Sequence, residues 1–149
     1  MPDVHQLAHM RVYMQIPVNG TEFSRPETRA KQASVRSHDE VDAFAAFYQH
    51  ASKNTPALLA MKHGKQPENG LVPDGYVVFL VWEQVPGSLL GNGLSPRYAN
   101  PPFWQLPLDQ RNEIRDVFKQ EYPKLLKLGF RPTFGSLDNL VWDSNLRKL

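Results

Sequence analysis

The fold is decided by the stretch Gly75-Tyr-Val-Val-Phe-Leu-Val-Trp-Glu-Gln-Val-Pro-Gly87. Its run of consecutive apolar residues, Tyr76 to Val81, is too long for a strand with one face in water, and it predicts a strand covered on both sides. Polar residues follow at once, and Pro86–Gly87 must then turn the chain. We therefore expect a buried strand that leads through a short crossover into a second part of the molecule.

Composition is that of a folded protein. The chain has 149 residues, of which 41% are hydrophobic and 11% aromatic, which suits one core and argues against disorder. The absence of cysteine excludes a disulfide framework and fits a reducing compartment. No apolar run is long enough for a membrane span, and the N-terminus lacks the pattern of a secretory signal. The net charge of +2 is too small to predict a nucleic-acid partner. We expect a cytoplasmic or otherwise intracellular protein.

Hydrophobic periodicity in the first half predicts strands around one helix. Apolar residues alternate over 10–18, which is the period of a half-buried strand, and Asn19–Gly20 suits a tight hairpin turn after it. A capping box formed by Ser37 and Glu40 opens a helix. Its apolar positions recur at helical spacing: Val41, Phe44, Phe47, Tyr48 and Ala51. Residues 56–63 should form a further strand that pairs with the apolar strand as an antiparallel hairpin.

Proline and glycine separate this half from the next. They are concentrated in residues 86–107, which form a connection, so we place one part at 1–85 and the other at 86–149. Asp109 should cap a long helix, which Pro123 should kink because its ring clashes with the carbonyl four residues earlier. The apolar stripe of this helix comprises Ile114, Val117, Phe118, Tyr122, Leu125 and Leu126.

Short elements are expected after the long helix. Gly129 should close it in a left-handed conformation. Residues 140–142 have the pattern of a short strand, and 146–149 that of the start of a return strand. The whole pattern predicts an α+β fold.

Three segments resemble the protein-kinase-like superfamily, and within it the fungal proteins related to aminoglycoside and choline phosphotransferases. They are the strand and hinge ending in Trp82–Gly87, the helix segment 40–47, and Asp138-Asn-Leu-Val-Trp-Asp143. The order of elements is also that of a kinase-like domain up to its catalytic loop. The resemblance implies a kinase-like small lobe, an antiparallel sheet with one helix, followed by a Pro-rich hinge and the first helices of a second lobe.

The resemblance also assigns nucleotide-binding roles. Trp82 would lie at the back of the nucleotide pocket, and the Glu83 carbonyl and Val85 amide would meet the adenine edge. Glu40 would pair with a basic residue that holds the nucleotide phosphates. Two alternatives stay open: Trp82 is core at the end of a buried strand, and Glu40 serves only the capping box. The candidates for the basic partner of the glutamate are Lys31 and Arg36.

Magnesium chemistry is only partly represented. Asn139 matches the asparagine that ligates magnesium in the family, although a turn asparagine bonded to its own backbone is an equally good interpretation. The position of the catalytic base, five residues earlier, holds the apolar Phe134. The sequence ends at Leu149, before the second metal-binding aspartate would follow, and it has no glycine-rich phosphate loop.

We therefore expect a truncated kinase-like domain without phosphotransfer activity, which acts as a nucleotide- or protein-binding module with ATP and magnesium as the implied ligands. One alternative is an active small-molecule or protein phosphotransferase completed by a missing segment or a partner chain. Another is a protein-interaction domain without a nucleotide site. A homodimer or another protein partner is expected, because the stripe of the long helix and the strand edge at 146–149 would lack cover.

Overall fold

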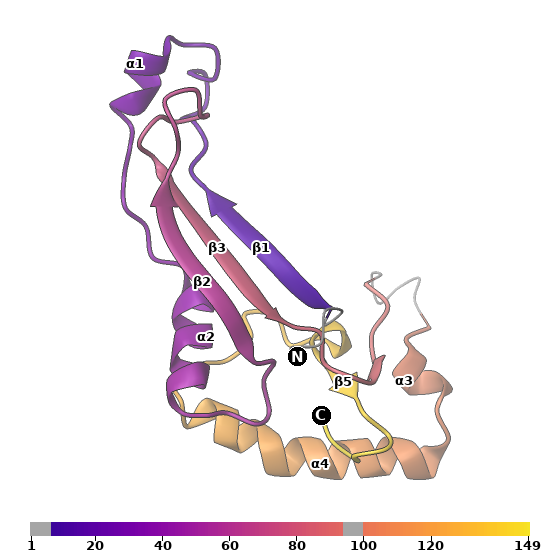
Figure 1. Cartoon of the computed structure of the whole chain (residues 1–149). Helices are drawn as coiled ribbons and strands as arrows, with labels where there is room; N and C mark the ends of the chain where they lie inside the picture. Colours follow the sequence, from indigo (N-terminus) through magenta and orange to yellow (C-terminus); the bar gives the residue numbers. More distant parts are fainter. Residues whose placement is uncertain (1–6, 94–99) are drawn as a thin grey trace. The chain divides into compact units, whose positions relative to one another are not determined.

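The computed structural model describes residues 7–93 and 100–149 and has an α+β fold (Figure 1). Within these residues it comprises a three-stranded antiparallel sheet, a two-stranded sheet and four α-helices. The contacts divide the chain into two compact units, and the division falls between Gln84 and Val85. Each unit has a hydrophobic core of its own.

The first unit is built on the sheet β1-β3-β2. Its strands are β1 (Ala8–Met14), β2 (Leu58–Lys65) and β3 (Tyr76–Glu83), and Figure 1 shows β3 between the other two. Both pairings are antiparallel, and the β2–β3 register is interrupted by an irregularity beside Leu59. The apolar run of the sequence therefore forms the central strand.

The helix α2 (Asp39–Gln49) covers one face of this sheet. Val41 and Phe44 of the helix pack with Val78 and Leu80 of β3, and all four side chains are buried. The burial of Phe44 thus confirms the prediction made from the helical spacing of the apolar residues. Tyr48 was expected on the same face but is 69% exposed, so the buried side of α2 is narrower than the spacing predicted.

The opposite face of the sheet differs from the prediction. No described element of the first unit covers it, so the expectation of a central strand buried on both sides is wrong for this unit. The alternating residues of β1 were expected to point inward, yet Met10 and Val12 are 64% and 45% exposed. Because residues two apart share a face, the pairing with β3 places Arg11 and Tyr13 on the helix side instead.

The connection from β1 to α2 is not a hairpin. Gly20 adopts a positive φ of 84° in a turn, as expected, but a second turn follows in which the Ser24 amide donates to the Thr21 carbonyl. The short helix α1 (Pro26–Ala30) comes next, with proline at the start, where its missing amide hydrogen costs no hydrogen bond.

The second unit packs two helices against a small sheet. Its strands are β4 (Ser88–Leu89) and β5 (Val141–Trp142), and its helices are α3 (Pro102–Gln105), α4 (Leu108–Leu126) and the 3-10 helix η1 (Leu137–Asn139). The buried side chains of its core are Leu90, Phe103, Ile114 and Trp142. These come from segments far apart in the sequence, so the core itself holds the unit together.

The ends of α4 correct one prediction and confirm another. The helix begins at Leu108 after Pro107, and Asp109 lies in its first turn instead of capping it, where its charge still complements the helix dipole. The helix continues through Pro123. Gly129 has a φ of 86°, and its amide donates to the Leu126 carbonyl, so the predicted left-handed termination is confirmed.

The expected uncovered surfaces of the second unit are corrected in part. Ile114, predicted on an unpartnered stripe, is 2% exposed within the core of its own unit, whereas Leu126 of the same stripe is 43% exposed. Residues 146–149 form no strand, and the chain closes there only through a bridge between Asp143 and Lys148. Among the described helices, none combines the length and the apolar character that a bilayer crossing requires.

Candidate functional site

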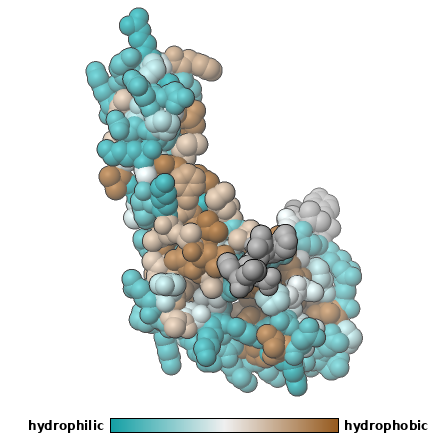
Figure 2. All heavy atoms as spheres, in the orientation of Figure 1, coloured by the Kyte–Doolittle hydropathy of each residue, from teal (hydrophilic) through white to brown (hydrophobic). Residues whose placement is uncertain are grey.

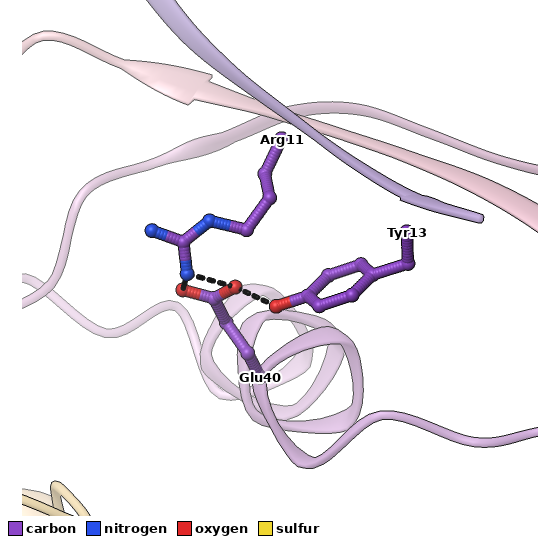
Figure 3. A network of polar contacts seen from close by, with 3 residues as sticks. All are labelled: Arg11, Tyr13 and Glu40. Carbon is purple, nitrogen blue, oxygen red and sulfur yellow. Dashed lines mark hydrogen bonds and ion pairs between the residues drawn. The ribbon is translucent and has the colours of Figure 1, made fainter. Parts of the chain in front are cut away.

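A charged polar network of the first unit joins β1 to α2 (Figure 3). The Arg11 Nη1 atom donates to both carboxylate oxygens of Glu40 at 2.6 Å. The Tyr13 hydroxyl donates to Glu40 Oε2. The carboxylate therefore accepts hydrogen bonds from two side chains of one strand, and we call these three residues the Glu40 network.

Strand and helix geometry bring the network together. Arg11 and Tyr13 are two residues apart on β1, so both point toward α2, as Figure 3 shows. Glu40 lies in the first turn of α2, where the helix dipole favours a negative charge. Burial and then the bond to Glu40 raise the pKa of the Tyr13 phenol. Tyr13 thus stays a neutral donor over the ordinary pH range.

This arrangement overturns two predictions about Glu40. The N-cap of α2 is His38, whose side chain makes no capping hydrogen bond, so the capping box with Ser37 is wrong. The basic partner of Glu40 is Arg11, and neither Lys31 nor Arg36 takes that place. The sequence did contain a signal for this network, because Arg11 and Tyr13 alternate with the apolar residues of the strand and therefore share one face of it.

Trp82 lies next to the network. Its ring centroid is 5.2 Å from that of Phe44 and 5.9 Å from that of His9, and the Arg11 guanidinium lies over it at 5.6 Å. The side chain is partly buried and packs against the first core, which agrees with the interpretation of Trp82 as core. Arg11 therefore contacts both Glu40 and Trp82, two of the residues to which nucleotide-binding roles were assigned.

The other two assigned residues lie at the unit boundary. Glu83 ends β3, where its amide donates to the Ala57 carbonyl at 3.0 Å and its side chain accepts from the Ala57 amide at 2.8 Å. Its carboxylate thus holds the chain that enters β2. Val85 is the first residue of the second unit. The structure brings Glu40 and Trp82 together through Arg11, whereas Glu83 bonds to Ala57 and Val85 belongs to the second unit.

The loop around η1 in the second unit is held by its own polar side chains. The Ser136 hydroxyl caps η1 by accepting from the Asp138 amide. Asp138 accepts from the Gly93 amide at 2.7 Å and from the Ser136 hydroxyl at 2.7 Å, and these two bonds lower the pKa of its carboxyl. A Cβ on Gly91 would lie 2.0 Å from the same carboxylate, so only glycine allows this approach.

Asn139, the candidate magnesium ligand, belongs to the same loop. Its Nδ2 atom donates to the Phe134 carbonyl, five residues earlier, at 2.8 Å. Phe134, at the position where a catalytic base was sought, is 80% exposed. Within residues 7–93 and 100–149, no three His, Cys, Asp or Glu side chains are grouped so that they could hold a metal ion.

Comparison with protein-family models, with curated proteins and with solved structures finds no match for this chain. The site must therefore be interpreted from its own geometry. That geometry offers one charged network that links a strand to a helix and one loop that is stabilised by its own polar groups.

We expect replacement of Glu40 by alanine to lower the free energy of unfolding by about 1–2 kcal/mol, measured by urea denaturation. The change removes the acceptor of Arg11 and Tyr13, and partial exposure of the ion pair keeps the loss modest. Asp42→Ala is the matched control, since it removes the same charge from the same helical turn at an exposed position. Equal losses in the two variants would mean that only the helix dipole is involved.

Proposed function

We propose that this chain is a kinase-like module without phosphotransfer activity that binds a protein partner. The observation that carries the proposal is the bonding of the η1 loop. Asp138 is held by Gly93 and Ser136, Asn139 is bonded to the Phe134 carbonyl, and the base position itself is apolar. The acidic and amide groups that could serve phosphoryl transfer are thus engaged in building the loop.

The kinase-like part of the proposal is supported by the first unit. A strand, two helices and two further strands follow one another, and the central strand of the sheet leads to the predicted hinge. A glutamate in the first turn of the helix pairs with a basic residue of the preceding strand. Arg11 would then stand where the resemblance implies a lysine. Arginine is not an equivalent replacement, because its planar guanidinium favours a fixed bidentate pair.

Nucleotide binding without catalysis is a second candidate, and Arg11 is the residue that favours it. Its side chain is 52% exposed beside Trp82, so the guanidinium could also meet a phosphate group. Calorimetric titration with ATP tests this candidate. Binding that is lost in Arg11→Met and kept in Arg25→Met, a change of an exposed arginine, would establish it.

We expect the purified chain to show no magnesium-dependent ATP turnover above a protein-free blank, with or without protein and small-molecule acceptors. The reason is that no carboxylate stands at the position of Phe134 to accept a hydroxyl proton. Asn139→Ala is assayed in parallel. Turnover in the native chain that disappears in Asn139→Ala would contradict the proposal and favour an active phosphotransferase.

A further inference from the structure

One face of the three-stranded sheet is apolar and open, and we call it the open sheet face. It is the side turned away from α2, and Figure 2 shows apolar side chains gathered along the sheet. The pairing registers assign these residues to it: Met10, Val12, Met14, Ala60, Val77, Phe79 and Val81, with Lys62 on the edge strand β2. Beyond β1, the same alternation continues in Ile16 and Val18, which are 69% and 61% exposed.

The central strand β3 is apolar on both faces of the sheet, but α2 covers only one of them. On the helix side, Val78 and Leu80 are 2% and 0% exposed. On the open face, Met10 and Val12 of β1 are 64% and 45% exposed, and Val77, Phe79 and Val81 of β3 are partly buried. Contiguous apolar patches of this kind mark interaction sites in soluble proteins. The strand β3 also has the continuous apolar sequence of a strand covered on both faces.

We propose that the open sheet face is an interface with the same face of a second copy of this chain. The inference deepens the proposed function, on which it rests, by naming the partner and the surface. A twofold interface brings one patch against itself, so the patch must not oppose like charges. Only Lys62, on an edge strand, and Glu83, at the end of β3, bring charge to this face within the registered strands.

Shape also favours a sheet as the occupant. Strands spaced by ~4.8 Å and rising ~3.3 Å per residue give a three-stranded face about 14 Å wide and 23 Å long. An identical sheet matches the face in width and length. Lys62 can extend its ammonium group past the edge of such a sandwich into water.

The area sets the strength of the expected dimer. Two faces of this size bury on the order of 1,000 Å² in total, which is at the small end of specific interfaces and typical of weak, reversible association. We therefore expect a monomer–dimer equilibrium in the micromolar range of concentration. The dimer should form without any additional ligand.

Sedimentation equilibrium over low to high micromolar concentration tests the interface. The native chain should approach the mass of a dimer, and Val12→Glu should weaken dimerisation at least about tenfold, because it places two carboxylates in the apolar interface. Val35→Glu is the matched control, since Val35 is fully exposed outside the sheet. Far-ultraviolet circular dichroism verifies that each variant is folded, and Met10→Glu replaces Val12→Glu if the latter unfolds.

A second measurement identifies the surface directly. The chain contains no cysteine, so Val12→Cys introduces a unique thiol for a spin label. Labels at Val12→Cys should show a short distance between copies, and the fraction of labels at that distance should rise with protein concentration. Labels at Val35→Cys should not show it. A native chain that stays monomeric, or a dimer unaffected by Val12→Glu, overturns the inference, including the case in which another protein covers the face. Detection of ATP turnover would instead contradict the proposed function, and it would not bear on whether the chain dimerises.

Discussion

Replacing Phe44 by alanine is expected to lower the free energy of unfolding by about 3–5 kcal/mol. Phe44 is 8% exposed and packs between Val41 of its own helix and the buried residues Val78 and Leu80 of β3. Its ring also contacts Trp82 at a centroid distance of 5.2 Å. The substitution removes the burial of an aromatic side chain and leaves a cavity that the sheet cannot fill.

Urea denaturation followed by circular dichroism measures this loss. Tyr48→Ala is the matched control, because it truncates an aromatic side chain of the same helix that is 69% exposed. The control should change the free energy of unfolding by no more than about 0.5 kcal/mol. If Phe44→Ala were as mild as Tyr48→Ala, the contact of α2 with the sheet would not be the core of the first unit.

Replacing Trp142 by alanine is expected to destabilise the second unit by a similar amount, about 3–5 kcal/mol. Trp142 is 8% exposed and shares its core with Leu90, Phe103 and Ile114. These residues come from the connection, from α3 and from α4, so the indole packs against three separate segments of the unit. Loss of the indole should therefore loosen the whole unit.

Trp104→Ala is the control for this variant. Trp104 is 52% exposed and stacks with Arg111 and Arg115 at the surface, so its removal should cost about 1 kcal/mol or less. Because each unit has a core of its own, two unfolding transitions are an expected result. In that case Phe44→Ala should shift one transition and Trp142→Ala the other. A common shift by both variants would mean that the two cores unfold as one cooperative unit.

Local pattern was sufficient for much of the secondary structure. The apolar run at 76–81 lies in the central strand, and the helical spacing of Val41 and Phe44 identified the buried side of α2. Gly129 was correctly expected in a left-handed conformation. These features depend on residues within one or two turns or on a single strand, so their period can be read directly from the chain.

The candidate site was less accessible to this reasoning. The four residues assigned to it were chosen by resemblance, and Arg11, which links Glu40 to Trp82, was not among them. The nearest candidates along the chain, Lys31 and Arg36, were preferred instead. An ion pair between residues 29 positions apart depends on where the strand and the helix pack, and no local pattern encodes that distance.

By itself the sequence determined the α+β class, the strand at 76–81 and the apolar side of α2, because each follows from a local period. Only the tertiary structure decided which phase of the alternation in β1 meets the helix. A period of two has two equivalent phases, and pairing with β3 selects between them. That selection turned Arg11 and Tyr13 toward Glu40 and left Met10, Val12 and Met14 on the open sheet face. The register of one strand pair thus created both the polar network and the apolar surface.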